Sequence, residues 1–303
     1  MTDFLSWGPD GLIPVIALLG GLWVLILSSD LFVEGAVGVA NHMGISPIVI
    51  GMVIVGFGTS APEMIVSTFS AIEGKPSLAL GNAFGSNIAN IGLILGITAI
   101  IQPILVHSNI LRRELPLLTG LTVFSFLLLM DGFLSRVDGF LLLISFICAL
   151  GWTVWISYKR PHDAIIQTVA GDVTEIKVPL SKSLGRLIIG LALLITSSRI
   201  LVWGAVELAL MAGISELIIG LTVVAIGTSL PELASTIAAV RKGQHDLAIG
   251  NVVGSNMFNT MAVVGIASSI APFSLDNEIL TLHFPVMAVL TLSLFVIGWG
   301  RKG

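Results

Sequence analysis

The stretch that decides the fold is GFGTSAPEMIVS at residues 56–67, which returns as AIGTSLPELAST at residues 225–236. Each copy places a glutamate, Glu63 or Glu232, inside a long apolar segment, with Thr-Ser and then a proline just before it. An ionisable side chain at membrane depth is costly, and it usually marks a functional site. The sequence therefore predicts two equivalent functional carboxylates in an apolar environment.

The composition around these motifs is that of an integral membrane protein. Of the 303 residues, 55% are hydrophobic and 11% are charged, whereas a soluble domain has about 25% charged residues. The net charge of −4 gives no indication of a nucleic-acid partner. The single cysteine, Cys148, lies in an apolar run and excludes a disulfide within the chain. Residues 1–10 have no basic region typical of a signal peptide, so we expect the first apolar stretch to be a retained span.

Apolar segments of about 18–25 residues can cross the hydrocarbon core of a bilayer. We predict nine spans, at residues 11–39, 46–72, 78–104, 115–130, 138–157, 185–211, 214–240, 247–270 and 282–299. The polar stretch 158–184 is the predicted linker between a first half, residues 1–157, and a second half, residues 185–303.

The basic residues predict the orientation. With the N-terminus outside, eleven of the lysines and arginines fall on the cytoplasmic side, and two, Lys75 and Arg136, fall outside. Such a bias is typical of membrane proteins. The expected location is the cytoplasmic (inner) membrane, with the lipid bilayer as the surrounding partner.

The two halves align without a gap when the chain is shifted by 169 residues. Residues 51–90 and 220–259 then share sixteen identities, many of them polar. Five predicted spans separate a residue from its counterpart, and because five is odd, the second copy enters the membrane from the opposite side. This pattern is typical of the inverted repeats of secondary transporters.

The repeated motifs predict broken helices lined with oxygen atoms. A proline removes a hydrogen bond from the helix and disturbs the preceding turn, so we expect breaks at Gly58-Thr59-Ser60 and at Gly227-Thr228-Ser229. Unpaired backbone at membrane depth is tolerated where it lines a polar cavity. Hard oxygen ligands suit Ca2+ or Na+, and two facing carboxylates match one Ca2+ in charge.

The segments GNAFGSNIAN at 81–90 and GNVVGSNMFN at 250–259 add further oxygen atoms. Ser86 and Asn90 lie four residues apart, on one helix face, as do Ser255 and Asn259. We expect four other asparagines either to contact an ion or to bond only the broken backbone; these are Asn82, Asn87, Asn251 and Asn256.

Together these motifs resemble the α-repeats of the cation/calcium exchanger superfamily, nearest to the prokaryotic sodium/calcium exchangers, over nearly the whole chain. The resemblance implies ten helices in two inverted halves, with the first and sixth helices sliding across a fixed core. It implies that Ca2+ is held by Glu63, Glu232, Thr59 and Thr228, near the carbonyls of Gly56 and Ala225. It implies that Na+ uses both glutamates, the same carbonyls and Ser60, Ser229, Ser86 and Ser255, with Asn90 and Asn259 completing the centre.

The chain departs from that pattern in two places. Many relatives have Asp where this chain has Asn259, which leaves one ionisable group fewer and the coupling ion and stoichiometry open. The predicted spans number nine instead of ten, so the tenth helix either is absent from the protein or lies beyond GWGRKG, the last residues of the sequence.

The leading hypothesis is a secondary antiporter that exchanges Ca2+ for Na+ by alternating access. A Ca2+/H+ antiporter or a K+-linked exchanger is the close alternative, and a cation channel is the alternative from another class. An intramembrane enzyme is not expected, because the chain has no HExxH motif and no serine with a histidine placed in a span. We expect no cofactor and find no indication of a protein partner.

Overall fold

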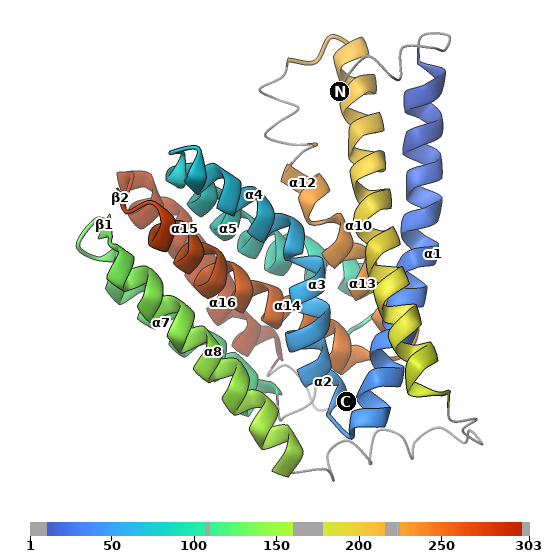
Figure 1. The fold of residues 1–303 in the computed structure, drawn as a ribbon, viewed down its shortest axis with the longest axis horizontal. Coiled ribbons are helices and arrows are strands. Elements are labelled where there is room, and N and C mark those ends of the chain that lie inside the picture. Colours follow the sequence, from blue (N-terminus) through green and yellow to red (C-terminus); the bar gives the residue numbers. More distant parts are fainter. Residues whose placement is uncertain (1–10, 107–109, 160–177, 216–222, 224, 299–303) are drawn as a thin grey trace.

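The computed structural model describes residues 11–106, 110–159, 178–215, 223 and 225–298, most of which are helical (Figure 1). The longer α-helices are α1 (Leu12–Met43), α4 (Ala61–Ile72), α5 (Pro76–Ala89), α7 (Leu115–Leu129), α8 (Arg136–Lys159), α10 (Leu180–Met211), α13 (Leu230–Arg241), α14 (His245–Met257) and α16 (Phe284–Gly298). The shorter ones are α2 (Pro47–Ile50), α3 (Gly56–Thr59), α6 (Gly96–Ile101), α12 (Ala225–Thr228) and α15 (Val264–Ile270). The π-helical segments are η1 (Gly51–Val55), η2 (Asn90–Leu95), η3 (Ile110–Glu114), η5 (Phe258–Val263) and η6 (Ile279–His283). Two short strands, β1 (Phe133–Leu134) and β2 (Phe273–Ser274), pair antiparallel and join two turns.

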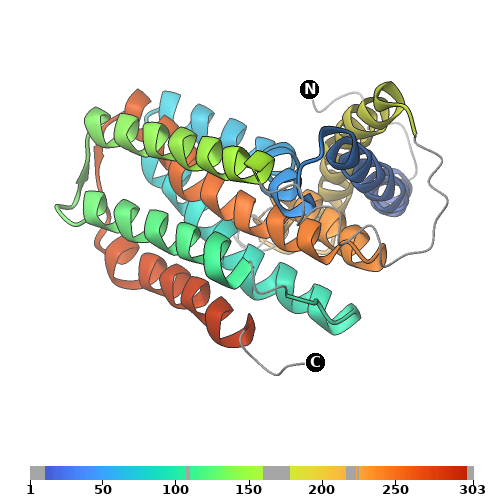
Figure 2. The same ribbon diagram turned by 90° about the horizontal axis from the view of Figure 1, so that it is seen from below.

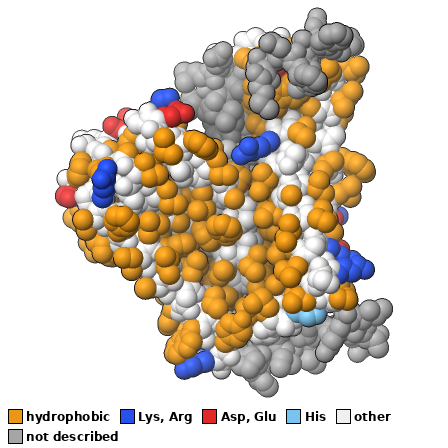
Figure 3. Space-filling model, viewed as in Figure 1, with side chains coloured by type: hydrophobic (Ala, Val, Ile, Leu, Met, Phe, Trp, Pro, Cys, Tyr) orange, Lys and Arg blue, Asp and Glu red, His pale blue; other side chains and the backbone are white. Residues whose placement is uncertain are grey.

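The surface of the protein is apolar, as the composition predicts. Large hydrophobic side chains are exposed along the outer faces of the helices, and charged side chains are sparse between them (Figure 3). Among the described residues, six helices are long and apolar enough to cross a membrane, or seven if a bent pair is counted as one span. The chain is thus an all-α polytopic membrane protein.

The described residues contain six or seven helices that could cross a membrane, fewer than the nine spans that the sequence predicts. The predicted span at 115–130 corresponds to α7, which has 15 residues and follows η3 directly. Part of the predicted span at 214–240, and residues 160–177 of the predicted linker, lie outside the described residues. The helix before the linker, α8, ends at Lys159, and the helix after it, α10, begins at Leu180. Both positions are close to the predicted linker bounds.

Several elements recur with the 169-residue shift of the sequence repeat. Their bounds coincide after the shift for α4 and α13, for η3 and η6, and for α7 and α16. The π-helical segment η2 likewise has its counterpart in η5, displaced by one residue. The repeat in the sequence is therefore accompanied by a repeat of local structure, which includes the positions of the π-helical segments.

The helices α1 and α10 form an antiparallel pair at one side of the molecule (Figures 1 and 2). Their glycines allow this close approach: a Cβ atom added at Gly21 would lie 2.9 Å from Leu201 Cβ, and one at Gly204 would lie 2.6 Å from the carbonyl oxygen of Pro14. Small residues at helix contacts let two backbones pack closely in a membrane. The helices α1 and α10, which are counterparts under the 169-residue shift, thus run in opposite directions.

Charged side chains gather at one end of this pair. Lys242 Nζ lies 3.1 Å from Glu34 Oε1 and 3.4 Å from Asp30 Oδ1, and Arg186 Nη1 lies 3.3 Å from Glu34 Oε2. These ion pairs join α1 and α10 to the turn after α13. Asp30, which has Arg199 as its counterpart under the shift, therefore finds its partner in Lys242.

The central helix of the fold is the continuous segment α14–η5–α15. Its most apolar window is buried completely, whereas that of its counterpart α5–η2–α6 is 39% buried. The difference arises partly because α8 packs along α15, where a Cβ at Gly139 would lie 2.7 Å from Ser268 Oγ. One half of the protein therefore covers its middle helix more fully than the other.

Candidate functional site

Glu63 and Glu232 each lie in the first turn of a helix that follows a break. Ser60 separates α3 from α4, and the two parts of that span are bent by 49°. Ser229 separates α12 from α13, and its backbone angles, φ −90° and ψ 5°, are close to those of Ser60, φ −83° and ψ 2°. Proline occupies the first turn after each break, where a missing N–H costs little. The break occurs in both copies where the motif predicts one.

The two glutamates are removed from solvent. Glu63 and Glu232 are each 1% exposed, and the negative charge of each opposes that of the other. A helix N-terminus favours a nearby negative charge, which partly offsets this repulsion. Two like charges in a buried place need a cation or protons to be stable.

A hydrogen bond across the two halves connects the motifs directly. Ser60 Oγ donates to Glu232 Oε1 over 3.1 Å, although 172 residues separate them in the chain. Thr59 Oγ1 lies 3.0 Å from the carbonyl oxygen of Val55 and 3.1 Å from Asn251 Oδ1. The first motif is thus in contact with the second motif and with the segment that follows it.

Most of the predicted ion ligands are buried. The buried members are Gly56, Thr59, Ser60, Glu63, Ser86, Asn90, Ser229, Glu232, Ser255 and Asn259. Thr228 is partly exposed, and Ala225 begins α12, with its side chain outside what the structure describes. The carbonyl of Gly56 accepts a hydrogen bond from the N–H of Ser60 at 3.0 Å, so an ion would have to share that oxygen.

Many polar atoms of these residues have no partner within the described part of the protein. They are both carboxylate oxygens of Glu63, Oε2 of Glu232, the hydroxyls of Ser229 and Ser255, Oδ1 of Asn90, and both amide atoms of Asn259. Each buried polar group without a partner costs about 1–3 kcal/mol. A bound cation would satisfy the oxygen atoms together, and carboxylate, hydroxyl and amide oxygens are the ligands that Ca2+ and Na+ prefer.

The donor set does not suit a transition metal. Among the described residues, no three His, Cys, Asp or Glu side chains are grouped so that they could hold a metal ion. The free cysteine, Cys148, is exposed on α8. The site offers two carboxylates and neutral oxygens, as the motifs predict for a hard cation.

Two asparagines that the sequence left undecided hold the glutamates in place. Asn251 Nδ2 lies 3.4 Å from the backbone carbonyl of Glu232 and 2.9 Å from Thr236 Oγ1. Its counterpart, Asn82, bonds the carbonyl of Glu63 at 3.3 Å and the hydroxyl of Ser67 at 3.0 Å. The signal was present in the sequence, because both copies keep Asn at this place and a hydroxyl residue four positions after the glutamate.

The other two undecided asparagines, Asn87 and Asn256, link the segment α5–η2 to the segment α14–η5. Asn87 Nδ2 lies 2.6 Å from Thr260 Oγ1, and Asn90 Nδ2 lies 3.0 Å from Asn256 Oδ1. These contacts hold η5 against α5 near the π-helical segments, which often occur at functional sites. The bond to Asn256 fixes the orientation of the Asn90 amide, whose Oδ1 has no partner within the described part of the chain.

We expect Asn251→Ala to lower the apparent Ca2+ affinity of the site by roughly 30-fold, because about two hydrogen bonds of about 1 kcal/mol each are lost around Glu232. Ca2+ binding to the purified protein measures this. Asn82→Ala removes fewer contacts and should have the smaller effect. Equal affinity in Asn251→Ala and the unchanged protein would contradict a positioning role.

The fold and site define a class: an all-helical membrane protein with a buried, oxygen-lined centre between two similar halves. The family model for the sodium/calcium exchanger protein matches residues 13–155 and 182–300. The chain belongs to the sodium/calcium exchanger family.

Individual relatives agree with this assignment. A protein of Alkalimonas amylolytica named as the antiporter CaxA is 43% identical, covering 94% of this chain and 90% of that protein. The sodium/calcium exchanger MaX1 of Methanosarcina acetivorans is 30% identical, covering 95% and 92%. A structure of the sodium-calcium exchanger NCX_Mj, soaked with 10 mM Na+ and 10 mM Sr2+, has a TM-score of 0.82 at 34% identity and covers 96% of this chain and 92% of that one.

Proposed function

We propose that the protein is a secondary antiporter that exchanges Ca2+ for Na+ at a site between its two halves. The observation that carries the proposal is the set of buried oxygen atoms, including those of Glu63 and Glu232, that have no partner among the residues the structure describes. The names of the relatives, which include sodium/calcium exchangers, support the same pair of ions. The twelve predicted ligands remain the proposed ion-binding set.

The charge of the site suits this exchange. Two ionised glutamates are neutralised by one Ca2+ or by two Na+, so either load leaves no net charge. A third Na+ would give the site a charge of +1, and the exchange would then move charge across the membrane. Because Asn259 cannot ionise, it adds no further negative charge to either load.

An inverted arrangement of the halves fits alternating access. The antiparallel α1–α10 pair and the matching element bounds support two repeats of opposite orientation, residues 1–157 and 185–303. In such transporters one part moves against the other around a central site. We propose that α1 and α10 form the moving part, with the N-terminus outside in the cytoplasmic membrane.

The coupling ion decides between this proposal and Ca2+/H+ exchange. The purified protein is placed in liposomes loaded with Na+, which are diluted into Na+-free buffer while Ca2+ entry is followed. Matched liposomes contain K+ and receive an imposed pH gradient. Entry that requires internal Na+ supports sodium coupling; entry driven by the pH gradient alone supports proton coupling and would refute the proposal. Currents far above transporter turnover would indicate a channel.

Ca2+ should stabilise the folded protein, because a ligand that binds the native state shifts the unfolding equilibrium. At a Ca2+ concentration 100 times the Kd, the stabilisation is about 2.7 kcal/mol, which corresponds to an increase of roughly 5–10 °C in the unfolding midpoint. Thermal unfolding with Ca2+ and with chelator measures the shift. Mg2+ provides the control, since it requires near-ideal octahedral geometry and keeps its waters. An equal shift with Mg2+ would contradict a site of this kind.

A further inference from the structure

The helices α1 and α10 interlock through their backbones. A Cβ atom added at Gly190 would lie 2.6 Å from the backbone nitrogen of Phe32, and one added at Gly35 would overlap the backbone nitrogen of Leu187. Backbone atoms cannot rotate away as the end of a side chain can, so sliding one helix along the other would produce clashes. The two helices therefore form one unit, which is the unit that the proposed function requires to move.

The contact between α1 and α13 is of a different kind. The described glycines of α1 that have a close neighbour, Gly21, Gly35 and Gly38, face α10 and not α13. Between α1 and α13 lies an apolar groove of about 260 Å3, which we call the α1–α13 groove. One face of each helix lines it, at spacings of three and four residues, as with Leu22, Leu25 and Ile26 on α1 and Leu230, Leu233 and Ala234 on α13. Apolar contacts are not directional, so α1 can shift along this loosely filled face at low cost.

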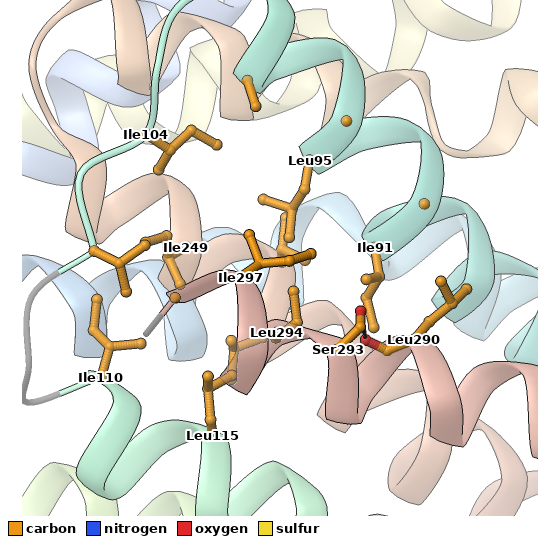
Figure 4. A pocket seen from close by; sticks show the side chains of 17 residues that line it. Ile91, Leu95, Ile104, Ile110, Leu115, Ile249, Leu290, Ser293, Leu294 and Ile297 are labelled. Atoms are coloured by element: carbon orange, nitrogen blue, oxygen red, sulfur yellow. Dashed lines mark hydrogen bonds between the residues drawn. The ribbon is translucent and has the colours of Figure 1, made fainter. Parts of the chain in front are cut away.

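The α1–α13 groove extends from the proposed ion site to the charged end of the α1–α10 pair. Along α13 its lining begins at Leu230, next to the break at Ser229, and ends at Arg241, next to Lys242. It is separate from the larger cavity of about 430 Å3 that Figure 4 shows, because none of the residues that line that cavity belongs to α1 or α13. A change at the charged end can thus act on the whole contact between α1 and α13.

The ion pairs at this end fall into two kinds. Lys242 Nζ, in the turn after α13, lies 3.1 Å from Glu34 Oε1 and 3.4 Å from Asp30 Oδ1 of α1. Arg186 of α10 pairs with the same Glu34 at 3.3 Å. A slide of the α1–α10 pair along α13 would break the pairs of Lys242, whereas the pair of Arg186 would travel with the two helices.

We propose that Lys242 is a latch for the α1–α10 pair: it holds Asp30 and Glu34 in the described conformation and releases them when the pair slides along α13. The proposal rests on the proposed movement of this pair, and not on which ion drives it. Lys242 is a positioning residue and is not one of the proposed ion ligands. Its side chain is 30% exposed, and those of Asp30 and Glu34 are 42% and 43% exposed. Ion pairs this exposed are weak, so the latch favours one conformation without locking the protein in it.

The test measures the opening of the α1–α13 groove in the full chain, with Cys148→Ser as the background. Ala238 lines the groove and is 4% exposed. In Ala238→Cys, the rate of modification by a water-soluble maleimide is followed in Na+-free buffer with chelator. Lys242→Gln should raise this rate roughly fivefold, the effect of losing two partly exposed ion pairs. Asp30→Asn removes one of the two pairs and should raise the rate less, and Lys242→Arg, which keeps the charge, should leave it low.

Arg186→Gln is the matched control, because it removes an ion pair within the moving unit and should leave the rate unchanged. Raising choline chloride from about 0.1 M to about 1 M shortens the Debye length from about 10 Å to about 3 Å. The rate should therefore rise with salt when Lys242 is present and stay level in Lys242→Gln. A rate in Lys242→Gln that equals that of the unchanged background, or an equal rise in Arg186→Gln, would overturn the proposal.

This measurement separates the latch from the proposed function. Modification of the thiol needs no ion gradient, so its result does not depend on the Ca2+ flux assay. Groove opening in Lys242→Gln supports the latch even if liposomes show proton coupling. Sodium-coupled flux with no change in modification would overturn the latch alone. Elution as folded protein, with equal unfolding midpoints, shows that the variants are comparable, and Asp30→Asn provides the test if Lys242→Gln does not fold.

Discussion

Glu63→Gln is expected to reduce Ca2+ exchange by roughly 100- to 1,000-fold while the protein still folds. The substitution keeps the size of the side chain and removes one of the two buried carboxylate charges of the proposed ion site. Removing one partner of a buried pair of opposite charges, here the glutamate of the proposed glutamate–Ca2+ pair, costs about 3–5 kcal/mol, and 1.4 kcal/mol corresponds to a factor of ten. Glu232→Gln should have a similar effect, because the two glutamates occupy equivalent places after equivalent breaks. Ca2+ flux into liposomes, with protein content equalised, is the measurement.

Glu73→Gln is the matched control for this substitution. Glu73 lies at the end of α4, its side chain is 61% exposed, and it pairs with Lys75 at 3.1 Å. An exposed ion pair contributes at most about 1 kcal/mol, so flux should be unchanged. Flux in Glu63→Gln that equals the control would remove Glu63 from the proposed mechanism, and the same result in Glu232→Gln would remove Glu232.

Gly254→Ala is expected to lower the unfolding midpoint by roughly 5–10 °C, through overpacking between the two halves. A Cβ at Gly254 would overlap the carbonyl oxygen of Met52 and lie 2.5 Å from its Cα. These are backbone atoms, which cannot rotate away as the end of a side chain can. The same contact holds η1 against α14 beside the proposed ion site, so Ca2+ affinity should fall together with stability.

Gly120→Ala should raise the unfolding midpoint, whereas Gly254→Ala should lower it. Gly120 lies within α7, and an added Cβ meets no described atom within 4 Å. Alanine in a helix interior is about 0.5–1 kcal/mol more favourable than glycine. Thermal unfolding of both variants under identical conditions checks the contrast. A midpoint for Gly254→Ala at or above that of Gly120→Ala would contradict the close approach of η1 and α14.

The sequence was sufficient for the helix breaks and for the burial of most proposed ligands. Proline and glycine impose their backbone preferences locally, so the breaks at Ser60 and Ser229 could be predicted without tertiary information. The membrane class followed from composition alone. The family assignment rests on motifs that the family model also recognises.

Other features depend on contacts between distant segments and could not be predicted. The bond from Ser60 to Glu232 requires that two segments 172 residues apart meet with a definite rotation. The π-helical turns arise within continuous helical patterns, and no residue type marks them. The roles of Asn82 and Asn251 became clear once the carbonyls of the glutamates were seen beside them.

The length of the α1–α10 pair has a mechanical consequence. Each helix has 32 residues, which at 1.5 Å per residue span about 48 Å, whereas the hydrocarbon layer is about 30 Å thick. Tilt takes up part of this excess, and the remainder projects into the headgroup regions. In α1, however, the uncharged run at residues 12–29 spans only about 27 Å, so the part that projects is the end that carries Asp30 and Glu34. A movement of α1 along its own axis by several ångströms in one direction would therefore bring this charged end into the hydrocarbon, so the position of Asp30 and Glu34 limits such a movement in that direction.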